Sequence, residues 1–165
     1  MDELQNEEQY KQALITSLRL LAASPKSGQE IRKKLTDKGY AKNNIDRALQ
    51  ELQKQGVLDD SLYAKDLVAR LMHGKAAGKF KIAFELKRHG VSEKIRSDLL
   101  DSITPEAESE RALEQARAKW TGWKNVEPQK RKKRLYDFLV RKGYNFQIAQ
   151  DVLQQLVKEP LGDDF

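Results

Sequence analysis

Apolar residues recur along the chain in three groups that share one spacing. In each group, two apolar residues four positions apart are followed by a glycine four positions further on: Ile31, Leu35 and Gly39; Ile82, Leu86 and Gly90; Leu135, Leu139 and Gly143. A spacing of four places both apolar residues on one face of a helix. Glycine readily adopts the left-handed conformation that closes a helix. The three groups therefore predict three helices, each ended by its glycine.

Two more helices are predicted around each of these. After each glycine, an apolar stripe at spacings of four and then three or four predicts an amphipathic helix. These stripes are Ile45, Leu49 and Leu52; Ile95, Leu99 and Ile103; and Ile148, Val152 and Leu156. Before each group a further helix is predicted at about residues 9–23, 61–73 and 106–120, the middle one with Leu62, Leu67, Val68 and Leu71 as its apolar side.

The glycines are separated by 51 residues (39 to 90) and then by 53 (90 to 143), a period typical of helical repeats. We therefore expect an all-α protein of three tandem three-helix repeats, with about nine helices. The expected copies are 9–58, 59–104 and 105–157, flanked by an acidic N-terminal arm (1–8) and a C-terminal tail (158–165). Because three short helices bury little apolar surface alone, neighbouring copies must pack on one another. The expected shape is elongated, and such an array can curve.

Residues that start helices agree with this division of the chain. Ser27 and Glu30 have the spacing of a capping box, in which each side chain satisfies a backbone amide of the first turn. Asp59 and Asp60 offer N-cap oxygens to the fourth helix, and Thr104 precedes a proline at the first position of the seventh.

The same residues resemble the RecX family of bacterial recombination regulators. The most specific part is residues 27–40, Ser-Gly-Gln-Glu-Ile-Arg-Lys-Lys-Leu-Thr-Asp-Lys-Gly-Tyr, followed by Ile45-Asp46 and by Gln-Gly-Val-Leu-Asp-Asp at 55–60. Residues 78–92 resemble the family's second block and residues 138–144 its third. The resemblance covers about residues 10–157.

The resemblance implies a protein that lodges in the helical groove of the RecA filament on single-stranded DNA. Members of the family lower ATP hydrolysis, strand exchange and cleavage of the SOS repressor by that filament. The chain is accordingly expected to regulate DNA recombination and repair as a monomer, without catalysis of its own and without a cofactor.

Charge along the chain is segregated. The sequence has 31 Lys and Arg against 25 Asp and Glu, a net charge of +6, and a field of this sign favours polyanions. Two segments, 70–96 and 124–142, each have eight Lys or Arg against two acidic residues, an excess of about six positive charges per segment. Candidate contacts to the RecA filament, or to single- or double-stranded DNA, are Arg70, Lys75, Lys79, Lys81, Lys87, Arg88, Lys130, Arg131, Lys132, Lys133, Arg134, Arg141 and Lys142. We interpret the run at 130–134 as the exposed face of the eighth helix.

The alternative function is a free-standing, basic helical-repeat protein that grips DNA phosphates without a protein partner. A purely structural scaffold is a third hypothesis. Helix-turn-helix readout is disfavoured, because residues 42–55 and 146–157 have few Arg or Lys to reach guanine edges. Aromatic residues at 120, 123, 136, 138 and 144 could stack on bases, but we favour a core role for them.

Several classes of protein are disfavoured by what the sequence lacks. There is no cysteine, so disulfides and thiolate metal sites are excluded. Neither His73 nor His89 has an acid or serine at a recognisable triad or metal spacing, and both are expected at the surface. The acidic N-terminus does not resemble a signal peptide and no apolar run is long enough to span a membrane. We expect a cytoplasmic protein.

Overall fold

A computed structural model describes residues 3–159, and the regular structure within this stretch is entirely helical. It contains nine α-helices: α1 (Glu3–Ala23), α2 (Gly28–Asp37), α3 (Lys42–Lys54), α4 (Asp60–Ala69), α5 (Lys79–Arg88), α6 (Glu93–Asp101), α7 (Pro105–Gly122), α8 (Pro128–Lys142) and α9 (Phe146–Lys158). One turn of π-helix, η1 (Arg70–Gly74), follows α4 directly. The predicted all-α architecture of nine helices is confirmed for the described residues.

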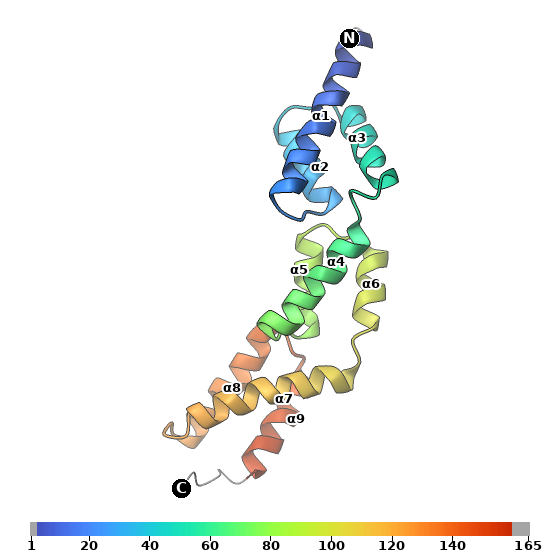
Figure 1. The fold of residues 1–165 in the computed structure, drawn as a ribbon. Coiled ribbons are helices and arrows are strands. Elements are labelled where there is room, and N and C mark those ends of the chain that lie inside the picture. The colour runs from blue at the N-terminus through green and yellow to red at the C-terminus, as the bar shows by residue number, and fades with distance from the viewer. Residues whose placement is uncertain (1–2, 160–165) are drawn as a thin grey trace. The chain divides into compact units, whose positions relative to one another are not determined.

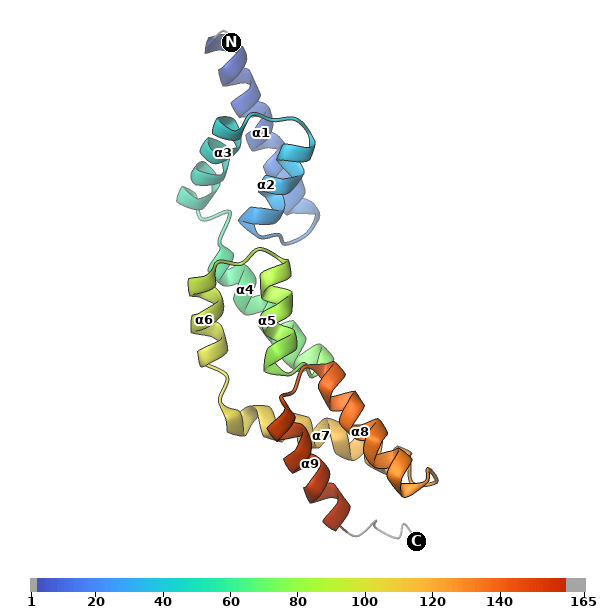
Figure 2. The same ribbon diagram turned by 180° about the vertical axis from the view of Figure 1, so that it is seen from behind.

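The described chain divides into two compact units that do not follow the sequence repeat. The first unit comprises the described residues through Leu67 together with Leu86–Arg96, and the second comprises Val68–Glu85 together with the described residues from Ser97 onward. Helices α4, α5 and α6 therefore contribute to both units. Within the first unit α1, α2 and α3 pack together, and within the second α7, α8 and α9 do (Figures 1 and 2).

The positions predicted to face the core on the middle helix of each copy are buried in all three copies. The side chains eight and four residues before each glycine are completely inaccessible: Ile31, Leu35, Ile82, Leu86, Leu135 and Leu139. In the first and third copies the stripe of the following helix, α3 or α9, packs against them. In the middle copy Ile95 and Leu99 on α6 are only half-buried, so this helix is covered less completely.

The three glycines end their helices by one geometry. Gly39, Gly90 and Gly143 have φ of 86°, 70° and 89°, the left-handed region that glycine enters at little cost. In each copy the residue after the glycine donates its amide to the carbonyl of the residue four positions before the glycine. In the third copy this bond runs from Tyr144 to Leu139 at 3.2 Å. These bonds satisfy carbonyls at the helix end that have no partner within the helix.

The first and the fourth helix differ from the sequence prediction. The first begins at Glu3 rather than about Gln9, because residues of the predicted acidic arm contact α3: Asn44 donates to Asn6 at 2.9 Å, and Arg47 to Glu7 at 3.1 Å. The predicted tail at 158–165 lies mostly outside the described residues.

The prediction that Leu62 faces the core is also wrong. Leu62 is 57% exposed, whereas its neighbour Tyr63 is 8% exposed. The buried residues of α4 and η1 are spaced by four from Tyr63 and from Ala64, and Leu62 lies off that face. The predicted helix at 61–73 therefore has a different buried face, and its last turn is the π-helical η1.

Candidate partner-binding site

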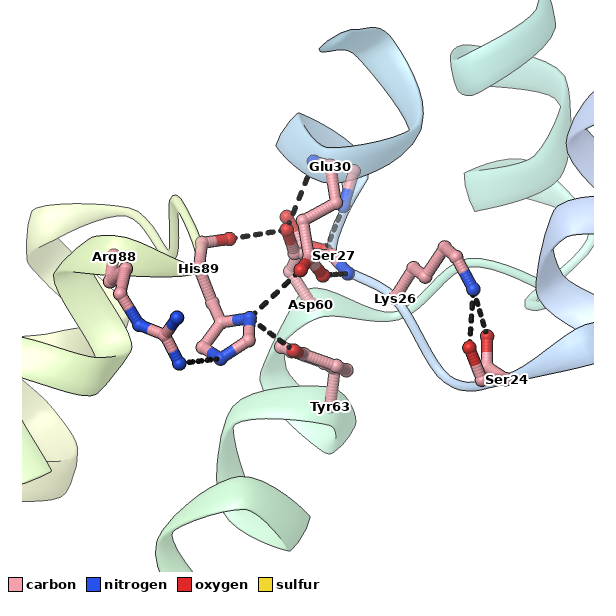
Figure 3. A network of polar contacts seen from close by, with 9 residues as sticks. Ser24, Lys26, Ser27, Glu30, Asp60, Tyr63, Arg88 and His89 are labelled. Carbon is pink, nitrogen blue, oxygen red and sulfur yellow. Dashed lines mark hydrogen bonds and ion pairs between the residues drawn. The ribbon is translucent and has the colours of Figure 1, made fainter. Parts of the chain in front are cut away.

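The start of α2 meets the end of α5 in the first unit, and we call this contact the first junction (residues 27–30, Asp60 and 89–90). Ser27 caps α2 by accepting from the Glu30 amide at 3.2 Å, and its hydroxyl donates to the backbone carbonyl of His89. The Gly28 amide donates to Asp60 Oδ1 at 2.7 Å. Figure 3 shows these groups converging from three segments of the chain.

The His89 imidazole completes the first junction. Its Nδ1 lies 2.8 Å from Glu30 Oε1 and 3.0 Å from the Tyr63 hydroxyl (Figure 3). Burial by itself raises the pKa of Glu30, but the Ser27 amide and the contacts with His89 and Tyr63 outweigh it, so the pKa lies below its ordinary value. The sequence showed no acid at a recognisable spacing from His89, because its partner Glu30 is 59 residues away in the chain.

Serine, histidine and glutamate thus meet at one place, but not in the geometry of a nucleophilic triad. A catalytic serine needs its hydroxyl on the imidazole nitrogen, which removes the proton. Here the Ser27 hydroxyl donates to a backbone carbonyl, and the residue is completely buried. The three groups hold two helix ends together.

The start of α5 meets the end of α8 in the second unit, and we call this the second junction (residues 78–81, Glu108 and 142–143). Here the backbone itself forms the contact: the Gly78 amide donates to the Lys142 carbonyl at 2.8 Å, and the Phe80 amide donates to the Gly143 carbonyl at 3.0 Å. A Cβ added to Gly78 would lie 2.4 Å from the Gly143 carbonyl carbon. Only glycine allows so close an approach.

The two junctions occupy equivalent positions of the repeat. Ser27 and Gly78 both lie twelve residues before the glycine that ends their own helix, and each meets the end of the corresponding helix in the next copy. The next residue donates its amide to a carboxylate from the first helix of that copy: Gly28 to Asp60, and Lys79 to Glu108 at 2.7 Å. Asp60 therefore caps α2, while Asp59 caps α4, with its Oδ1 2.9 Å from the Leu62 amide.

Lysines gather at the second junction around Phe138, which is half-buried. The ammonium nitrogens of Lys119 and Lys142 each lie 5.6 Å from the centre of the Phe138 ring. The Lys142 ammonium also donates to the Lys75 carbonyl at 2.6 Å. Burial, together with the positive charges of Lys81 and Lys119, lowers the pKa of Lys142 below its ordinary value. We call Lys81, Lys119 and Lys142 the lysine cluster.

The other predicted contact residues are distributed over both units. In the first, Lys87 and Arg88 line a shallow groove with Arg32 and Lys33 of α2. In the second, the residues Arg70, Lys75, Lys130, Lys133, Arg134 and Arg141 are exposed, whereas Lys79, Lys81, Lys132 and Lys142 are half-buried. Sequence analysis missed Lys119, because it follows an acidic segment and only packing brings it to Phe138.

Arg131 lies in the core, contrary to the interpretation of residues 130–134 as an exposed face. It is 4% exposed, its guanidinium lies 3.7 Å from the centre of the Trp120 ring, and it donates to the Trp120 carbonyl. Desolvation lowers the pKa of Arg131. A cation on an aromatic face with a carbonyl acceptor is well placed to stabilise the unit. Arg131 is therefore not available to a partner.

The preference for a core role of the aromatic residues is confirmed. Trp120 and Tyr144 belong to the buried core of the third copy, and Trp123, Tyr136 and Phe138 pack against it. The Tyr144 hydroxyl donates to the Ala76 carbonyl at 2.7 Å. Burial is the main cause of a raised pKa of this phenol.

The described residues form neither a group of metal ligands nor a membrane-spanning helix. Between residues 3 and 159, no three His, Asp or Glu side chains are grouped so that they could hold a metal ion. Among the helices described above, none combines the length and apolar character needed to cross a bilayer.

Comparison with known proteins identifies the family. Family models of the first, second and third three-helix domains of RecX match residues 13–52, 59–100 and 106–153. A regulatory protein RecX of Clostridium perfringens is 32% identical over 156 residues, which is 93% of this chain and 73% of that protein. Another, from Pelodictyon phaeoclathratiforme, is 32% identical over 92% of this chain and 93% of its own length. The chain belongs to the RecX family.

Solved RecX structures share its fold. The crystal structure of RecX from Lactobacillus salivarius superposes with a TM-score of 0.81 at 18% identity, covering 92% of this chain and 98% of that one. A second RecX crystal structure gives a TM-score of 0.75 at 22% identity, covering 93% and 78%. The RecX relatives are named as regulatory proteins. The three-helix domains are therefore the shared architecture of RecX.

Proposed function

We propose that this chain binds the RecA filament on single-stranded DNA, in its helical groove, and lowers the ATPase, recombination and SOS coprotease activities of that filament. The observation that carries the proposal is the match of all three RecX domains in order along the chain. We further propose that the chain acts by binding alone. The arrangement of Ser27, Glu30 and His89 supports this, because it serves a helix contact rather than catalysis.

The distribution of positive charge supports a partner of opposite charge. Exposed basic side chains occur in both units, as Lys87 and Arg88 in the first and Lys133 and Arg134 in the second. A repeat array can follow a helical polymer, because its equivalent units meet equivalent sites of the polymer. Charges spread over several such units increase the affinity through multivalency, since each later contact forms within an existing complex.

The decisive experiment follows ATP hydrolysis by RecA assembled on circular single-stranded DNA as the chain is added. Inhibition is expected at concentrations well below that of RecA. Unchanged hydrolysis at those concentrations would reject the proposal. If the chain instead bound naked DNA tightly, with a steep salt dependence, and left RecA unaffected, the free-standing DNA-binding alternative would replace it.

Charge-reversed variants test which basic residues contribute. Lys87→Glu/Arg88→Glu changes the first unit, and Lys133→Glu/Arg134→Glu changes the second with the same total charge. The pair that raises the concentration for half-maximal inhibition more strongly contributes more to the contact. Arg131 is left unchanged in both variants, because its loss would disturb the core.

A further inference from the structure

The lysine cluster brings like charges together in a way that the first junction does not. In the first unit Arg32 pairs with Asp46, and His89 lies against Glu30. At Lys142, by contrast, the neighbouring charges that act on the ammonium are those of Lys81 and Lys119, which have the same sign. Like charges held close and partly desolvated repel one another, and an anion bound among them removes that repulsion.

The cluster is confined to a small area. Lys119 and Lys142 lie at equal distances from the Phe138 ring, so their nitrogens are separated by no more than twice 5.6 Å. The backbone of Lys81 packs directly against Gly143, the residue after Lys142, because a Cβ added to Gly143 would lie 2.4 Å from the Lys81 amide nitrogen. The three side chains thus come from α5, α7 and α8 to one place, which suits neighbouring anionic groups on one chain.

An exposed aromatic ring projects from the same turn of α5. Phe80 is 66% exposed although its amide is bonded to the Gly143 carbonyl at 3.0 Å. It also lines a mainly apolar cavity of about 180 Å³, whose other lining residues are Lys79, Ala83, Leu100, Glu108 and Asn145. Leaving a phenyl ring in water forgoes the stabilisation that its burial would provide. An aromatic ring beside a basic site is the combination that binds unpaired nucleobases by stacking.

We propose that Lys81, Lys119, Lys142 and Phe80 form a binding site for a single nucleic-acid strand, in which the ammonium groups hold phosphates and the Phe80 ring stacks on a base. This inference rests on the proposed function, because a filament on single-stranded DNA supplies such a strand. It assigns nucleic-acid contact to the second junction and not to the equivalent first junction. An acidic protein segment fits less well, since it would use the lysines but has no bases to stack on Phe80.

The test measures binding of the full chain to a fluorescein-labelled oligothymidine by anisotropy, with no RecA present. Lys81→Gln/Lys119→Gln/Lys142→Gln is expected to raise Kd about tenfold or more at moderate salt. It should also reduce the slope of log K against log salt by about 2, as the loss of three phosphate contacts to a single strand requires. Lys119→Gln alone, at an exposed position, should give a smaller change in the same direction.

The matched control is Lys34→Gln/Lys38→Gln/Lys42→Gln, which removes the same charge from exposed positions of the first unit. Lys38 is the repeat equivalent of Lys142. The control should change Kd and the salt slope much less. Equal losses for the two triple variants, or wild-type binding by the lysine-cluster variant, would overturn the proposal. Circular dichroism and thermal unfolding verify that each variant is folded.

Phe80→Ala separates stacking from charge. It should weaken binding to oligothymidine about tenfold and leave binding to an abasic strand of the same length unchanged. Equal weakening on both strands would contradict stacking. If oligoglutamate of the same charge competed as well as oligothymidine, and Phe80→Ala had no effect, the site would be assigned to an acidic protein segment and the proposal would fail.

The RecA assay is read separately. Normal inhibition of RecA by a variant that no longer binds oligothymidine would leave the proposed function standing and limit this site to free strands. Loss of oligothymidine binding together with inhibition would place the site in the filament contact. Wild-type chain that binds oligothymidine through the cluster but does not affect RecA would reject the proposed function alone.

Discussion

The two junctions lie at equivalent positions of the repeat but hold their helix ends by different means. At the first, side chains fill the contact: the hydroxyl of Ser27, the carboxylates of Glu30 and Asp60, and the imidazole of His89. At the second, Gly78 lets the backbone of α5 bond directly to the backbone of α8. Both retain the carboxylate from the next copy, Asp60 or Glu108, on the amide of the helix start.

This difference shows what the repeat conserves. A helix start presents amide groups and a helix end presents carbonyl groups, so the two ends attract one another whatever side chains lie between them. The side chains are therefore free to differ between the junctions. At the second junction the helix ends meet through backbone hydrogen bonds, and no histidine-carboxylate pair such as His89 and Glu30 takes part. We propose the strand-binding site among the lysines of this second junction.

The largest expected effect is at Gly143. Gly143→Ala places a Cβ 2.4 Å from the Lys81 amide nitrogen in a residue with φ of 89°. We expect unfolding in urea to show a loss of about 3 kcal/mol or more, from the clash together with the left-handed strain. Gly39→Ala is the control, because Gly39 has φ of 86° but open space around it, and should cost about 1 kcal/mol. Equal losses would mean that the second junction is not closely packed.

The equivalent change at the first junction should be partly reversed by a second substitution. Gly90→Ala places a Cβ 2.5 Å from the Cβ of Gln29, and we expect a loss of about 2 kcal/mol in the same assay. Gln29→Gly in that background removes the clashing atoms, so the part of the loss caused by the clash should return and the strain of the left-handed residue, about 1 kcal/mol, should remain. At the second junction Lys81→Gly should not rescue Gly143→Ala, because the clash includes the backbone. Rescue at both junctions would remove the distinction between them.

The third equivalent position is Arg131, which lies twelve residues before Gly143 and packs on Trp120 in the last turn of α7, within its own copy. Arg131→Ala should reduce the free energy of unfolding by about 2 kcal/mol through lost cation–π and hydrogen-bond contacts. Lys133→Ala, two residues away and exposed, should stay within about 0.5 kcal/mol of wild type. A loss of unfolding free energy from Lys133→Ala as large as that from Arg131→Ala would contradict the assigned core role of Arg131.

The smallest effect is a pH dependence specific to the first junction. Since the pKa of Glu30 is lowered in the folded state, the unfolded chain takes up this proton first as the pH falls. The stabilisation is present above about pH 4.3, the ordinary glutamate value, and is lost as the pH falls through the folded pKa. Thermal unfolding between neutral and acidic pH should show a shallower loss for Glu30→Gln than for wild type. Glu110→Gln, at an exposed position of the second unit, should follow wild type.

The charge pattern predicted the residues of the proposed site less well than the apolar pattern predicted the fold. It selected Lys81 and Lys142 because they lie in basic segments, but it also selected Arg131, which is buried. It omitted Lys119, which follows the acidic segment at 98–117. A run of charges shows that a segment is polar, whereas the face on which each charge lies depends on which helix packs against it.

The sequence alone predicted the number of helices, the glycines that end α2, α5 and α8, and the threefold repeat. The spacing of four between apolar residues and the glycine that ends a helix are both visible in a short stretch of sequence. The buried positions of Ile82 and Leu86, and the end of their helix at Gly90, could therefore be predicted from their neighbours in the chain. Only the tertiary structure decided what each helix end meets. His89 and Glu30 are 59 residues apart, and Gly78 and Gly143 are separated by more than a full repeat. Contacts of this kind depend on packing between copies, and neither periodicity nor composition records it.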